Sequence, residues 1–237
     1  DPVAGPASDP MRVIDALRER VVGAVVVTGQ HDREGGGATV LKAPMYSAYR
    51  EFLEGRERFQ RHQDYRGAIP YFERAVALDS SFKMAMQFLA VAHVNLGQYA
   101  AADSLVRRVD AMRDRLAPTE RDMHEWLRAV LRGDWDETVR RQQAIAARDP
   151  QYPLPHYLIG LHSVRRLRPD VALPALLASD SGMTARGWAP QIGALADAYH
   201  QLGRHEDELA TVARGRRLFP TNRTLLARAL RAHAPLR

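Results

Sequence analysis

The sequence predicts an all-α solenoid of about five helix pairs, because one short signature recurs at a nearly fixed interval. Gly or Gln, a polar residue, an aromatic residue and, three positions later, a small residue occur at 63–68, 97–102 and 133–138. Weaker versions follow at 169–172 and 202–208. Their last positions, 68, 102, 138, 172 and 208, are 34, 36, 34 and 36 residues apart. Ser80, Pro150 and Pro220, which close repeats, are each two periods apart. This period is typical of stacked helical hairpins.

Residues 1–43 are predicted to form an N-terminal extension. Residues 1–10 are rich in Pro and Ala and should be irregular. Residues 11–27 can form an amphipathic helix, since apolar residues recur at helical spacing: Ile14, Leu17, Val21 and Val25. The β-branched end of this segment, 25–28, could instead be a strand. A glycine-rich loop is expected at 30–39.

The solenoid is predicted over 44–237, with helices joined in pairs by short turns. The predicted pairs are 47–62 with 65–78, 82–95 with 99–113, 119–132 with 135–148, 155–166 with 169–178, and 188–202 with 205–219. Asn222 can cap a final helix over 223–233, which would close the array.

The chemistry of the turns supports these boundaries. Glycines stand just past the first helix of three pairs, where a left-handed backbone costs glycine little: Gly97, Gly133 and Gly203. Asp residues can cap or precede second helices: Asp64, Asp134 and Asp170. Pro118 and Pro169 fall in first turns, where their missing N–H matters least. The small residues Ala68, Ala102 and Ala172 would let paired helices approach closely.

These residues resemble the tetratricopeptide repeat over about residues 46–222. The first repeat supplies Phe52, Phe59, Tyr65, Ala68, Phe72 and Ala75, and the second supplies Leu89, Ala90, Leu96, Gly97, Tyr99 and Ala102. The fifth supplies Leu195, Ala196, Tyr199, Gly203 and Pro220, but His205 and Glu208 depart from the pattern. The third and fourth repeats are degenerate and are supported mainly by register. The resemblance implies a right-handed superhelix and a non-catalytic scaffold that binds protein or peptide.

The resemblance also implies where a partner would bind, because first helices line the concave face in this family. The corresponding positions are Arg50, Leu53, Glu57, Met84, Phe88, Val91, Asn95, His124, Leu127, Tyr157, Leu161, Arg165, Asp197 and His200. Leu53 and Glu57 stand where the family's clamp for a C-terminal carboxylate has Lys and Asn. The sequence therefore does not favour that clamp.

A narrower likeness concerns the setting of the repeats. Residues 48–79, 95–105 and 113–118 resemble repeat regions of large bacterial regulatory proteins, some of which carry kinase or DNA-binding domains. We therefore expect a segment of a larger protein, and the chain's start at Asp1 without a leader agrees with this expectation. The compartment is not determined.

The sequence offers little support for catalysis, a cofactor or a metal site. There are no cysteines, which excludes thiolate ligands and nucleophiles. His124-Glu125 begins a zincin-like motif, but Arg128 stands at the position of its second histidine. His200 and His205 lie on either side of a turn, so their spacing predicts no convergent ligands. Gly35-Gly36-Gly37 lacks the Lys and Ser/Thr of a phosphate loop.

The basic composition admits a nucleic-acid alternative. The net charge is +6, and 32 of the 34 basic residues are Arg, spread along the chain among acids. The densest basic stretch lies near the C-terminus: Arg214, Arg216, Arg217, Arg223, Arg228, Arg231 and Arg237. It lacks interleaved aromatics for base stacking, which makes this alternative weaker than protein binding. A small-molecule-sensing module, with a pocket lined by Phe88 and Tyr157, is a further alternative.

The predicted helix 82–95 is apolar nearly all round between residues 82 and 94, and such a helix is buried on both faces. Its concave face must be covered or form an exposed patch of the kind found at interfaces. Two explanations involve the N-terminal helix. It could cover this face, in the manner of a partner helix, or it could cap the edge of the first repeat.

Overall fold

The computed structural model describes residues 13–15, 17–25 and 43–232. These residues form helices and turns, without strands, as the period predicts. The glycine-rich loop predicted over 30–39 lies outside the described residues. So does the possible strand over 25–28, except for Val25, which is helical. The chain divides into two compact units, residues 1–134 and 135–237, each described below by itself.

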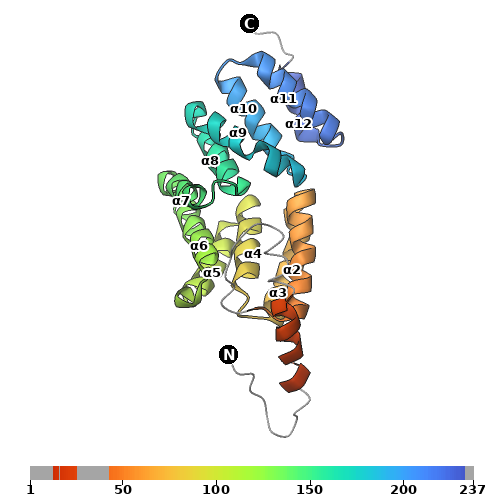
Figure 1. Ribbon diagram of the computed structural model, residues 1–237, viewed down its shortest axis with the longest axis vertical. Coiled ribbons are helices and arrows are strands. Elements are labelled where there is room, and N and C mark those ends of the chain that lie inside the picture. The colour runs from red at the N-terminus through yellow and green to blue at the C-terminus, as the bar shows by residue number, and fades with distance from the viewer. Residues whose placement is uncertain (1–12, 16, 26–42, 233–237) are drawn as a thin grey trace. The chain divides into compact units, whose positions relative to one another are not determined.

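The described residues 43–134 of the first unit form two complete helix pairs and one further helix (Figure 1). Its helices are α2 (Tyr46–Glu57), α3 (Tyr65–Leu78), α4 (Lys83–Asn95), α5 (Tyr99–Asp110) and α6 (Pro118–Leu131). Helix α2 continues into a π-helical turn, Arg58–His62, and a short 3-10 turn at Arg113–Arg115 precedes α6. The turn glycines and capping residues predicted in this unit lie where one helix ends or the next begins.

Helix α4 is buried because it packs against α3, α5 and α6. Phe88, on its predicted concave face, contacts three rings of the first repeat: Phe52 at 5.2 Å, Phe59 at 5.7 Å and Phe72 at 5.9 Å between centroids. Edge-on and tilted ring pairs of this kind are favourable beyond the area they bury. The apolar character of 82–94 is therefore largely accounted for inside the repeats.

The N-terminal helical segment, 13–15 and 17–25, contacts the start of α2. The Glu19 carboxylate accepts a hydrogen bond from the Ser47 amide at 2.8 Å, and thus binds one of the free N–H groups at that helix N-terminus. Gly23 lies so close to the Pro44 carbonyl that a Cβ would stand 2.3 Å from its oxygen. Five of the segment's apolar side chains remain 36–68% exposed: Ile14, Leu17, Val21, Val22 and Val25. These contacts agree with a cap on the first repeat, and the exposed apolar residues do not act as a cover.

In the second unit, residues 135–232 form six helices (Figure 1). They are α7 (Trp135–Arg148), α8 (Pro153–Arg165), α9 (Pro169–Ala185), α10 (Pro190–Gln201), α11 (His205–Leu218) and α12 (Arg223–Ala232). Helices α8 and α9 pack closely, since Gly160 lies against Leu176 with no room for a Cβ. The core around them includes Tyr157, Leu176 and Leu195.

Most predicted turn residues act as expected. Gly97, Gly133 and Gly203 have φ of 72°, 67° and 68°. The Asp64 carboxylate accepts from the Gly67 amide at 2.8 Å, and the Asn222 side chain accepts from the Leu225 amide at 3.1 Å. The small residues Ala68, Ala102 and Ala172 are fully buried.

With the π-helical turn counted as part of α2, the predicted helix ends differ from the structure by at most three residues except at α9, where the difference is larger. Helix α9 extends to Ala185 although the sequence predicted an end near 178. Buried Ser179 links this part of the helix to α10, because its hydroxyl donates to the Gln191 side-chain oxygen at 3.0 Å and the Gln191 amide donates to the Leu176 carbonyl at 2.7 Å. The helix ends before Gly187, whose φ is 73°. The predicted end therefore fell just before Ser179, a buried polar residue whose hydroxyl forms a hydrogen bond with another helix.

Candidate functional site

In the first unit, most of the predicted partner-binding positions are accessible. On α2, Arg50 and Glu57 are exposed and Leu53 is partly exposed. On α4, Asn95 is exposed, while Met84 and Val91 are partly exposed. Residues 50, 53 and 57, and residues 84, 91 and 95, each follow helical spacing, so each set forms one stripe. The two helices are in contact, since Phe52 of α2 packs on Phe88 of α4 and on Phe82, the residue that precedes α4.

Phe88 is mainly a core residue, although it is one of the predicted partner-binding positions on α4. Its ring contacts three aromatic rings of the first repeat, as described above. A partner could touch its partly exposed edge, but its main role is packing.

Two predicted positions on α6 are not accessible. His124 and Leu127 are both 0% exposed. The His124 Nε2 atom lies 2.8 Å from Asp110 Oδ1, and Arg128 donates to the same carboxylate oxygen at 3.2 Å. The register of this degenerate repeat, which the sequence could not fix, turns both side chains inward.

The predicted positions on α8 are also largely buried. Tyr157 is 4% exposed and its ring packs edge-on against Trp188 at 6.0 Å. Leu161 packs against the same core, and Arg165 alone of the three is exposed. Of the three partner-binding positions that the repeat pattern implies on α8, only Arg165 is therefore exposed to a partner.

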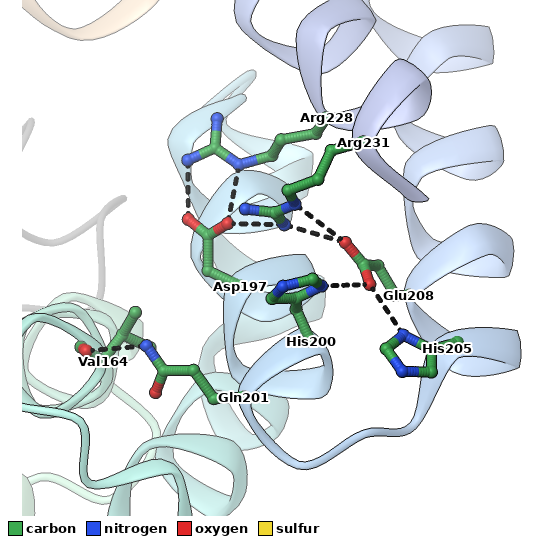
Figure 2. A network of polar contacts seen from close by, with 8 residues as sticks. All are labelled: Val164, Asp197, His200, Gln201, His205, Glu208, Arg228 and Arg231. Atoms are coloured by element: carbon green, nitrogen blue, oxygen red, sulfur yellow. Dashed lines mark hydrogen bonds and ion pairs between the residues drawn. The ribbon is translucent and has the colours of Figure 1, made fainter. Parts of the chain in front are cut away.

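The predicted positions on α10 are engaged in polar contacts within the second unit (Figure 2). Asp197 accepts from Arg228 of α12 through both carboxylate oxygens, at 3.1 and 2.6 Å, and from Arg231 at 2.9 Å. Bidentate Arg–carboxylate pairs are the stronger kind of ion pair. His200 points away from these arginines and toward Glu208 of α11, and the two side chains are 2.8 Å apart.

Glu208 is the centre of this network. It is fully buried at the position where the repeat pattern has a small residue. One of its oxygens, Oε1, accepts from Arg231 at 2.8 and 3.2 Å, and the other, Oε2, faces His200 Nδ1 at 2.8 Å and His205 Nδ1 at 3.5 Å. Burial alone would raise the pKa of Glu208, but the hydrogen bonds and charges of Arg231 and His200 outweigh it and lower the pKa. Glu208 is therefore a carboxylate at neutral pH.

The arrangement corrects the prediction that His200 and His205 do not converge. One ligand atom from each of His200, His205 and Glu208 lies within 4.8 Å of the other two. The tight turn at Gly203 carries the chain from α10 into α11 and places both imidazoles beside the buried carboxylate. The departures at His205 and Glu208 from the repeat pattern were the only sequence signal of this cluster.

The basic C-terminal stretch is partly neutralised. Arg214 pairs with Asp180 at 2.6 Å, Arg228 with Asp197, and Arg231 with Asp197 and Glu208. Arg216, Arg217 and Arg223 remain exposed, and Arg237 lies outside the described residues. Such pairing lowers the positive charge that a nucleic acid could meet here.

Within the described residues, none of the helices has the length and apolar content needed to cross a membrane.

Comparison with solved structures supports the repeat fold. The chain is similar to a thermophilic tetratricopeptide-repeat protein of Thermus thermophilus, with a TM-score of 0.59 and 20% identity, over 78% of this chain and 98% of that one. It is also similar to a structure of the APC/C hetero-tetramer Cut9-Hcn1, with a TM-score of 0.57 and 14% identity, over 94% of this chain and 41% of that one.

Comparisons at the sequence level give no match. No protein-family model matches the chain, and no curated protein matches it significantly. The class defined by helix pairing, turn geometry and structural similarity is the all-α superhelix of paired helices. In particular, the chain has the fold of tetratricopeptide-repeat proteins.

Proposed function

We propose that the chain is a non-catalytic protein- or peptide-binding scaffold, and that the partner binds the first unit across α2 and α4. The observation that carries this proposal is the contrast between the predicted positions. Those on α6 and α8 are mostly buried and those on α10 are engaged by α12 or α11, whereas both stripes of the first unit are at least partly exposed.

The surface of α2 and α4, defined by Arg50, Leu53, Glu57, Met84, Val91 and Asn95, combines two kinds of contact. Leu53, Met84 and Val91 can bury apolar side chains of a partner. The flexible thioether of Met84 can adapt to different shapes. Polar groups at the ends of the stripes would orient the partner, as they do at the rims of other interfaces. This chemistry fits a peptide with apolar anchors.

The experiment is a selection of peptides from a random library on the purified chain. The dissociation constant of a selected peptide is then measured by fluorescence anisotropy for the native chain and for the Met84→Glu/Val91→Glu variant. The introduced carboxylates would face the apolar side chains of the peptide, which then lose their apolar contacts with Met84 and Val91. We expect the variant to bind at least about tenfold more weakly, which is about 1.4 kcal/mol.

The matched control is Leu78→Glu, which places the same charge at an apolar residue of α3 that is 47% exposed. Circular dichroism verifies that all three proteins are folded. Equal affinity for the native chain and the double variant would refute the proposed surface. Phe88→Glu is unsuitable as a probe, because it would place a charge among the rings of Phe52, Phe59 and Phe72.

The small-molecule alternative gains no support from the two rings on which it depended. Phe88 packs in the aromatic cluster of the first unit, and Tyr157 is buried against Trp188 in the second unit. The nucleic-acid alternative is weakened by the ion pairs of Arg214, Arg228 and Arg231. Protein or peptide binding therefore remains the function that the geometry supports best.

A further inference from the structure

We propose that His200, His205 and Glu208 form a binding site for a divalent transition-metal ion of the Zn²⁺ type, independent of the proposed partner surface. The three residues come from the end of α10 and the first turn of α11, so the site is built within one helix pair (Figure 2). Their candidate ligand atoms all lie within 4.8 Å of one another.

The distances between the ligand atoms fit the edges of a coordination polyhedron. Metal–nitrogen and metal–oxygen bonds of Zn²⁺ are about 2.0–2.2 Å, so neighbouring ligand atoms of a tetrahedral site stand roughly 3.3–3.6 Å apart. Glu208 Oε2 lies 2.8 Å from His200 Nδ1 and 3.5 Å from His205 Nδ1. The Glu208–His205 distance matches this edge, and the two imidazole nitrogens lie within 4.8 Å of each other, so the side chains would close around an ion that bonds to all three atoms.

The donor set selects the kind of ion. Two imidazole nitrogens and one carboxylate oxygen are typical ligands of Zn²⁺ and of other late first-row metals. Ca²⁺ and Mg²⁺ require sets made mostly of oxygen. Without a metal, the Nδ1–H group of His200 donates to Glu208 Oε2 at 2.8 Å. A metal ion that binds Nδ1 therefore displaces this proton, and the neutral imidazole carries its remaining proton on Nε2.

Arg231 prepares the carboxylate instead of competing for it. Its guanidinium donates to Glu208 Oε1, whereas Oε2 is the atom that faces both imidazoles. Outer hydrogen bonds of this kind fix the orientation of a ligating carboxylate. Asp197 and Glu208 together balance Arg228 and Arg231 in formal charge, so a cation approaches a group of side chains with no net charge.

The exposure of the ligands leaves room for an ion to enter. Glu208 is fully buried, but the side chains of His200 and His205 are 40% and 31% exposed. The rings lie 5.7 Å apart at 72°, with their Nδ1 atoms toward Glu208. Water can complete the coordination from the solvent side, which makes this an open, three-ligand site.

The test uses the whole chain, without a polyhistidine tag and after treatment with EDTA. Zn²⁺ is titrated by calorimetry at neutral pH, and Co²⁺ is used as a spectroscopic probe of nitrogen and oxygen coordination. We expect one Zn²⁺ per chain, a melting temperature that rises with Zn²⁺ concentration, and no response to Ca²⁺ or Mg²⁺. His205→Ala should bind Zn²⁺ at least about tenfold more weakly.

The matched control is His156→Ala, which removes another histidine of the second unit, one that contacts the Pro150 carbonyl and lies outside the cluster. Melting curves without metal show whether His205→Ala is folded; its longer 3.5 Å contact with Glu208 predicts little change. The proposal is overturned if the native chain binds no Zn²⁺ saturably. It is also overturned if His205→Ala binds Zn²⁺ as tightly as His156→Ala does.

Discussion

Arg231 of α12 donates two hydrogen bonds to one oxygen of Glu208 on α11, from Nε at 3.2 Å and from Nη2 at 2.8 Å. Glu208 replaces the small residue that the repeat pattern places between paired helices, and it is fully buried. A buried carboxylate is costly unless charged and hydrogen-bonding groups surround it. The two residues therefore depend on each other, and α12 is held to α11 by more than apolar contact.

This dependence can be measured in the free energy of unfolding. We expect Glu208→Gln to destabilise the chain by about 1–3 kcal/mol, because the partly buried guanidinium of Arg231 loses its charged acceptor. Denaturant unfolding followed by circular dichroism gives the value. In a double-mutant cycle with Arg231→Leu, the double variant should lose less than the sum of the two single variants. Strict additivity would show that the pair does not interact.

The stability of the second unit should depend on pH through His162. This side chain is 4% exposed, lies against Trp135, and burial lowers its pKa from 6.5 to about 4, with a smaller effect of Arg165. Between these two values the unfolded chain binds a proton that the folded chain does not. Stability is therefore lost as pH falls from about 6.5 to about 4, by about 3 kcal/mol in total.

The measurement is unfolding of the native chain and of His162→Phe across this pH range. The variant keeps a ring beside Trp135 but cannot bind a proton, so its stability should change less between pH 6.5 and 4. Glu208 contributes in a different window, because its lowered pKa makes its effect disappear only below about 4.5. The same pH dependence in both proteins would contradict the role of His162.

The aromatic cluster of the first unit should dominate the stability of that unit. Phe52 is 1% exposed and contacts Phe72, Phe82 and Phe88. We expect Phe52→Ala to destabilise the chain by about 3–5 kcal/mol, since it removes a buried ring and leaves a cavity. Leu78→Ala, at a residue that is 47% exposed, should cost less than about 1 kcal/mol in the same denaturant titration.

Gly97 offers a test of the turn between α4 and α5. Its φ is 72°, and a Cβ added there would meet no atom within 4 Å. Substitution therefore changes only the backbone energy, and we expect Gly97→Ala to cost about 1–2 kcal/mol. Gly97→Asn should cost less, because Asn tolerates the left-handed region. Equal stability of all three proteins would indicate that the turn relaxes to another conformation.

The repeat pattern predicted the architecture well because helix pairs depend on local signals. Gly97, Asp64 and Asn222 determine turns through their own backbone and side-chain chemistry, and each acts as predicted. The extension of α9 to Ala185 was missed because its cause is tertiary. The predicted end at 178 fell just before Ser179, whose hydroxyl donates to Gln191 of α10 in the fold.

The candidate site was predicted less completely, since it depends on which residue of a repeat faces inward. In the degenerate third and fourth repeats, His124, Leu127 and Tyr157 turned out to be buried. The grouping of His200, His205 and Glu208 was missed because spacing along the chain does not show how a turn brings two helices together. The residues at 205 and 208 depart from the repeat pattern, and this departure was the sequence signal that indicated an unusual cluster.

The proposed partner surface can be tested directly by photo-cross-linking. A selected peptide that carries a benzophenone group is irradiated with the native chain, and mass spectrometry maps the modified residues. We expect adducts on α2 and α4, above all at Met84, and their loss when unlabelled peptide competes. Adducts confined to α3, α5 or the second unit would contradict the proposed surface.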